Sequence, residues 1–89
     1  MSHKGEPSSQ VQAAIRGVLH QDWDPIPGAP LDEYDGQIGA VYRILVGSRS
    51  ETELVLLLRT AETGLLGRPT SSNAELQLVA RRLLEIQVT

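Results

Sequence analysis

The chain has 89 residues, enough for one domain but too few for a catalytic domain joined to a regulatory one. Its 11 acidic and 8 basic residues give a net charge of -3, which disfavours a surface that neutralises phosphates, so we expect no nucleic-acid partner. The absence of cysteine excludes disulfides, thiol nucleophiles and cysteine-ligated metals. No apolar stretch reaches the length of a membrane span, and we expect a soluble, cytoplasmic protein with no membrane partner.

The first segments predict a tail and one long helix. Residues 1–8 (MSHKGEPS) lack an apolar run, which predicts a disordered tail before a single helical domain at 9–89. The helix begins with Ser8 or Ser9 as its N-cap and continues to about Gln21. Its apolar residues recur at helical spacing: Val11, Ile15, Val18 and Leu19.

Two apolar runs in the middle of the chain fit either helices or the strands of a hairpin. These runs are residues 38–46 (IGAVYRILV) and 54–58 (LVLLL). Capping residues favour helices, because Ser50 and Glu53 have the spacing of a capping box and Gly47 suits the end of a helix. The hairpin stays the alternative.

The third and fourth helices complete the predicted fold. The third helix ends at Gly64, and because its 54–58 run is apolar all round, we expect it to be central and nearly surrounded. A second capping box, Ser72 with Glu75, opens the last helix, which continues to Ile86. The predicted fold is all-α, an irregular array of four helices with a long, proline-rich, acidic connection between the first two.

That connection stands out chemically. Residues 22–35 hold five of the eleven acids and two of the three aromatic residues. In the structural interpretation, the aromatic rings pack on the core and an acid caps the second helix. In the functional hypothesis, the segment binds a protein partner with a basic patch. The candidate surface comprises Trp23, Asp24, Asp32, Glu33, Tyr34 and Asp35.

Other functions have weaker sequence support. An EF-hand loop counted from Asp22 would need an oxygen ligand at Ile26 and glycine at Pro27, so we predict no metal site and no cofactor. A divalent-metal or small hydrolytic protein using the acidic segment, and a helix-turn-helix nucleic-acid binder, remain alternatives. We expect no catalytic residues and a protein-interaction module, with a homodimer through the 54–58 run as a further alternative.

Three landmarks resemble those of the YugE-like family of small bacterial all-helical proteins of unknown function. They are Trp23-Asp24-Pro25-Ile26, Asp32-Glu33-Tyr34-Asp35 and Glu62-Thr63-Gly64-Leu65. The chain departs from the family pattern at Pro27 and at residues 65–67. The resemblance implies an irregular four-helix array and assigns no activity, so no site residue is transferred from it.

Overall fold

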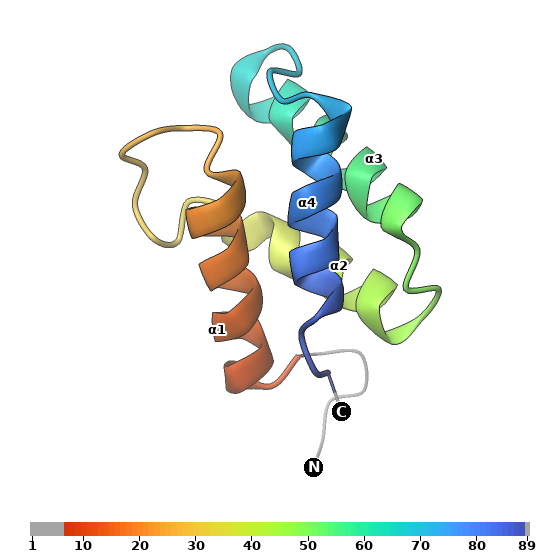
Figure 1. Cartoon of the computed structure of the whole chain (residues 1–89). Coiled ribbons are helices and arrows are strands. Elements are labelled where there is room, and N and C mark those ends of the chain that lie inside the picture. Colours follow the sequence, from red (N-terminus) through yellow and green to blue (C-terminus); the bar gives the residue numbers. More distant parts are fainter. Residues whose placement is uncertain (1–6, 89) are drawn as a thin grey trace.

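The computed structural model describes residues 7–88, in which four α-helices form an irregular array (Figure 1). The helices are α1 (Ser9–Val18), α2 (Ile38–Val46), α3 (Glu51–Leu66) and α4 (Asn73–Leu84). No β-strand occurs between residues 7 and 88, so the all-α prediction is confirmed and the hairpin is excluded. None of the helices in this part of the chain is both long and apolar enough to cross a membrane.

Serine residues cap three of these helices, as predicted. The Ser8 hydroxyl accepts a hydrogen bond from the backbone of the first turn of α1, and the Ser50 hydroxyl accepts one from the Glu53 N–H at 3.1 Å. At α4 the capping box is complete, since the Glu75 N–H donates to Ser72 and the Ser72 N–H donates to the Glu75 carboxylate. Each bond satisfies a backbone donor that the helix start leaves free.

The tail predicted at 1–8 falls largely outside the described residues, which exclude 1–6 and 89. Pro7 and Ser8 lie directly before α1, and Ser8 is its N-cap. The Gln12 side chain donates to the Pro7 carbonyl at 3.1 Å, in addition to the cap that Ser8 provides. Two residues assigned to the tail therefore make hydrogen bonds to α1.

The predicted end of α3 at Gly64 is wrong. The helix continues for two residues and ends at Leu66, with Gly67 as its C-cap. Gly67 has φ +81, and its N–H donates to the Thr63 carbonyl at 2.9 Å. This left-handed conformation is accessible to glycine at little cost, which explains the residue at this position.

The ends of α2 and α4 lie close to their predicted positions. The residue that follows α2 is Gly47. A Cβ added at this position would lie 2.9 Å from the Arg43 carbonyl oxygen, which is closer than carbon and oxygen atoms normally approach, so glycine fits here. The last helix ends at Leu84 rather than at Ile86. Ile86 is nevertheless half-buried and packs against the core, so its apolar character has a structural reason.

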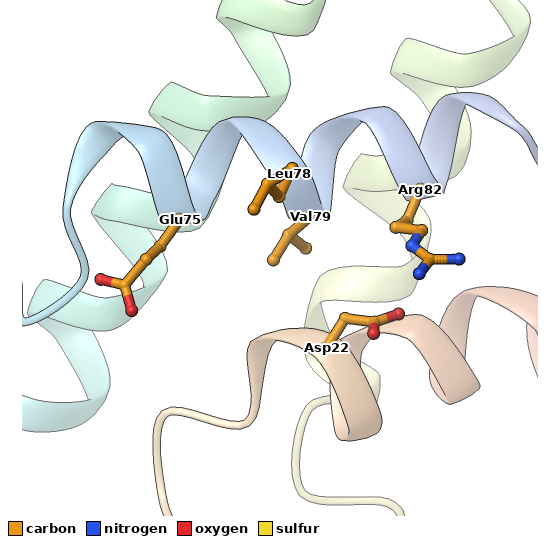
Figure 2. Close-up of a pocket in the computed structure, with 5 residues that line it drawn as sticks. All are labelled: Asp22, Glu75, Leu78, Val79 and Arg82. Carbon is orange, nitrogen blue, oxygen red and sulfur yellow. The ribbon is translucent and has the colours of Figure 1, made fainter.

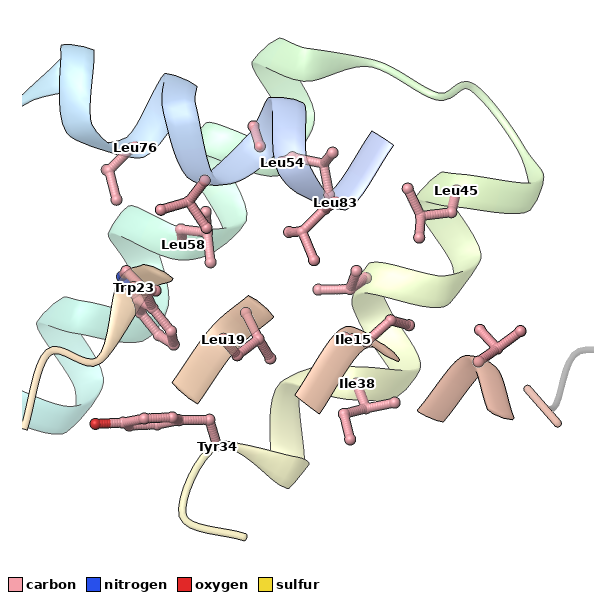
Figure 3. Packing of buried hydrophobic residues seen from close by; sticks show 14 residues of the cluster. Ile15, Leu19, Trp23, Tyr34, Ile38, Leu45, Leu54, Leu58, Leu76 and Leu83 are labelled. Carbon is pink, nitrogen blue, oxygen red and sulfur yellow. The ribbon is translucent and has the colours of Figure 1, made fainter. Parts of the chain in front are cut away.

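The buried apolar side chains form one cluster between the helices (Figure 3). Its members are Val11, Ile15, Leu19, Trp23, Tyr34, Ile38, Val41, Leu45, Leu54, Leu58, Leu76, Val79, Ala80 and Leu83. The expectation that α3 is nearly surrounded is wrong. Leu54 and Leu58 are fully buried, but Leu56 between them is 62% exposed, so only one side of the helix faces the core.

Candidate functional site

The acidic connection begins where α1 continues into a wider turn, the π-helical η1 (Leu19–Trp23). The Asp24 N–H donates to the Leu19 carbonyl, five residues earlier, at 2.9 Å. Asp24 then adopts a left-handed conformation, with φ 34 and ψ 63, directly before Pro25. Proline cannot donate the next helical hydrogen bond, so the chain leaves the helix there. The first helical segment thus ends at Trp23, two residues beyond its predicted end.

Tyr34 joins the two ends of the loop formed by residues 24–34. Its hydroxyl donates to the Asp24 carboxylate at 2.9 Å and accepts a hydrogen bond from the Ile26 N–H at 2.9 Å. Its ring packs on the Trp23 ring with a centroid separation of 5.2 Å. Burial raises the pKa of Tyr34, and the hydrogen bond to Asp24 acts in the same direction. Both rings also belong to the buried apolar cluster, which confirms the structural interpretation for the two aromatic residues.

Side chains of α1 and η1 also hold the loop. Arg16 makes a two-pronged ion pair with Asp35, at 2.9 Å from Nε and 2.7 Å from Nη2. The hydrogen bonds from Arg16 lower the pKa of Asp35. His20 Nε2 lies 3.1 Å from the Ala29 carbonyl oxygen. The middle of the loop is therefore attached to η1, and the residue that follows the loop is attached to α1.

The predicted acidic cap of α2 is wrong. A short 3-10 turn, η2 (Asp35–Gln37), precedes α2, and Gln37 is the N-cap without a side-chain hydrogen bond. Asp35 uses its carboxylate for Arg16 instead, because the two-pronged geometry of a guanidinium fits a carboxylate closely.

A buried carboxylate lies beside Trp23. Among the described residues, Glu62 of α3 is the one charged side chain that is fully buried. It accepts hydrogen bonds from Trp23 Nε1 at 2.9 Å, from the Thr70 and Ser71 N–H groups at 3.2 Å each, and from the Ser71 hydroxyl. Burial raises the pKa of Glu62, but these hydrogen bonds outweigh burial and the pKa is lowered. We call this cluster of Trp23, Glu62, Thr70 and Ser71 the Glu62 clamp.

Sequence reasoning missed the role of Glu62, although a signal exists. Leu54, Leu58 and Glu62 follow one another at a spacing of four residues, so they share one face of α3. An acid that continues a buried apolar row must have hydrogen-bond partners. The identity of those partners depends on how the chain folds back, since Trp23 lies 39 residues away in sequence.

The six predicted surface residues divide into two groups. Four of them hold the loop in place: Trp23, Asp24, Tyr34 and Asp35. The Trp23 and Tyr34 side chains are only 7% and 1% exposed, so they offer almost no contact area. Asp32 and Glu33 are exposed and lie beside Leu31, which is 58% exposed. We call Leu31, Asp32 and Glu33, the exposed turn directly before Tyr34, the loop tip.

The loop tip presents two carboxylates and one large apolar side chain to solvent. These groups suit the recognition of a surface that combines basic and apolar side chains. Between residues 7 and 88, no group of three or more histidine, aspartate or glutamate side chains is placed to hold a metal ion. The alternative of a metal-binding segment therefore gains no support from the geometry.

Comparisons with protein-family models, with curated proteins and with solved structures found no match to this chain. The resemblance to the YugE-like family stays a prediction. Its three landmarks nevertheless meet in space, because the 23–26 and 32–35 segments lie at the two ends of the loop and Glu62 accepts a hydrogen bond from Trp23.

Proposed function

We propose that this protein is a non-catalytic binding module that contacts another protein through the loop tip. The observation that carries the proposal is the exposure of Leu31, Asp32 and Glu33 together at the end of a loop held at both ends. The partner we infer has basic side chains around an apolar contact. The carboxylates would attract it, and Leu31 would occupy the apolar contact.

The internal contacts of the loop favour binding. A loop that is already ordered loses little conformational freedom when it binds, so more of the contact energy appears as affinity. The bonds of Tyr34 to Asp24 and Ile26, together with the Arg16–Asp35 ion pair, provide this order. None of these bonds uses a side chain of the loop tip, which leaves the tip available for a partner.

The test uses a neutralised tip and a control with the same charge change. Asp32→Asn with Glu33→Gln removes two charges from the loop tip, and Glu53→Gln with Glu85→Gln removes two from exposed positions on α3 and after α4. A cell lysate is passed over each immobilised variant and over the wild type. We expect proteins that the wild type and the control retain but the tip variant loses.

A captured protein is then purified and its affinity is measured against salt concentration. Exposed charges are screened by salt, so we expect the affinity of the wild type to fall as salt rises and to approach that of the tip variant. Leu31→Ser should weaken binding at every salt concentration. Equal retention of all partners by the wild type and the tip variant would refute the proposal.

A further inference from the structure

A second exposed surface lies on α4, away from the loop tip. Glu75, Leu78, Val79 and Arg82 of α4, together with Asp22 of η1, line a shallow groove of about 250 Å³ (Figure 2). Leu78 is 62% exposed, whereas Val79 belongs to the core. The groove therefore has an apolar centre with charged side chains at both ends.

The charges along this groove complement a second copy of themselves. Glu75 and Arg82 are seven residues apart, which is two helical turns, so they lie on the same face of α4. Leu78 and Val79 lie midway between them. A twofold axis through this midpoint would place a second α4 antiparallel to the first. Each Leu78 would then contact the other copy's groove, and each Glu75 would face the other copy's Arg82.

We propose that the chain forms a homodimer through antiparallel packing of α4 against α4. Glu75 can take part without losing its cap, because the Ser72 N–H occupies one carboxylate oxygen and leaves the other for Arg82 of the second copy. The guanidinium of Arg82 has five N–H donors, enough to bind the Glu75 carboxylate of the second copy. The proposal is argued from residues of α4, so its test is independent of binding at the loop tip.

The equivalent row on α3 lacks this complementarity. Glu53, Leu56, Leu57 and Thr60 repeat the spacing of Glu75, Leu78, Val79 and Arg82, and Leu56 is also 62% exposed. An antiparallel α3 pair would place Glu53 opposite an uncharged threonine. Leu56 and Leu78 are equally exposed, and Leu57 is less buried than Val79, so the apolar side chains do not favour α4. The charge pairing is what favours α4 over α3.

A contact between two single helices is small, and small interfaces are weak. We therefore expect a dimer that dissociates on dilution. Sedimentation equilibrium from low micromolar to near-millimolar concentration should show the average mass rising from one chain toward two. A mass of one chain at every concentration would overturn the proposal.

Two matched variants locate the interface. Leu78→Glu and Leu56→Glu introduce the same charge at equally exposed leucines on α4 and α3. Leu78→Glu should remain a monomer throughout, and Leu56→Glu should associate like the wild type. The proposal is wrong if Leu56→Glu weakens association as much as Leu78→Glu does, or if only Leu56→Glu weakens it.

Charge exchange tests the antiparallel pairing. Arg82→Glu places like charges opposite each other and should weaken association about tenfold or more, whereas Arg68→Glu, at an exposed turn residue, should not. Glu75→Arg should weaken association as well, and mixing it with Arg82→Glu should restore a dimer that contains one copy of each. Circular dichroism checks that Glu75→Arg keeps its helices without the cap. If Glu75→Arg loses its helices, the antiparallel pairing is tested by comparing Arg82→Glu with Arg68→Glu alone. Equal association of these two variants would refute the pairing of Glu75 with Arg82.

Discussion

A carboxylate in an apolar interior is stable only when hydrogen bonds replace the water that it loses. Glu62 has such bonds from a tryptophan ring, a serine hydroxyl and two backbone N–H groups. All four are donors, so the site requires an acceptor with two oxygens. A glutamine at this position would turn an N–H₂ group toward at least one of these donors.

We therefore expect Glu62→Gln to lower the free energy of unfolding by about 3 kcal/mol, because it leaves buried donors without an acceptor. Urea denaturation followed by circular dichroism measures the change. Glu53→Gln, at an exposed position on the same helix, is the control and should change stability by no more than about 0.5 kcal/mol. Similar effects of the two substitutions would show that Glu62 does not hold the clamp.

Glu62 should also make the stability of the folded protein sensitive to acid. The folded state lowers the pKa of Glu62 from its ordinary value of 4.5 and that of Asp35 from 3.8. Their stabilisation is therefore complete above these ordinary values and is lost as pH falls through the lower pKa values of the folded protein. We expect Tm to decline toward acidic pH, and less steeply in Glu62→Gln. Parallel declines in the two proteins would contradict this assignment.

At the scale of the helices, two glycines in the same helix end have opposite roles. Gly64 lies inside α3, where an added Cβ would meet no atom within 4 Å, whereas Gly67 has φ +81 at the C-cap. Alanine loses less conformational freedom than glycine in a helix but is strained in the left-handed region. The position of each glycine relative to the helix end thus determines the effect of a substitution.

Gly64→Ala should raise the free energy of unfolding by about 0.5 to 1 kcal/mol, and Gly67→Ala should lower it by about 1 kcal/mol. Thermal denaturation of the two variants beside the wild type tests both signs. Stabilisation by Gly67→Ala together with destabilisation by Gly64→Ala would indicate that α3 ends at Gly64.

These glycines also show what the sequence could and could not predict. The starts of α1, α3 and α4 follow from local chemistry, since a serine hydroxyl reaches the N–H three residues later as soon as the first helical turn forms. The end of α3 depends on tertiary packing. Leu65 and Leu66 are half-buried, and Leu65 packs against the core, which favours two more helical residues after Gly64.

Some features of the candidate site could likewise be predicted from the sequence and others could not. The packing of Trp23 and Tyr34 on the core was predictable from the aromatic character of these residues in a connection between helices. The division of the acids was not predictable. Asp35 binds Arg16, 19 residues away, and only the folded structure shows that this pair forms while Asp32 and Glu33 stay exposed.

For the molecule as a whole, the Glu62 clamp joins three segments: the end of η1, the end of α3 and the turn before α4. Trp23→Phe removes the indole donor and keeps an aromatic ring. Because Trp23 and Glu62 share one hydrogen bond, we expect the double variant with Glu62→Gln to lose about 1 kcal/mol less than the sum of the single losses. A double-mutant cycle by urea denaturation measures this coupling, and strictly additive losses would argue against it.

Trp23 is also the single tryptophan of the chain, and its ring lies between a carboxylate and the Tyr34 ring. Its fluorescence therefore comes from one site that lies at the base of the loop and within the clamp. The unmodified protein thus carries an intrinsic fluorescent probe. Its emission would report both the unfolding of the helices and any rearrangement of the loop when a partner binds, without an added label.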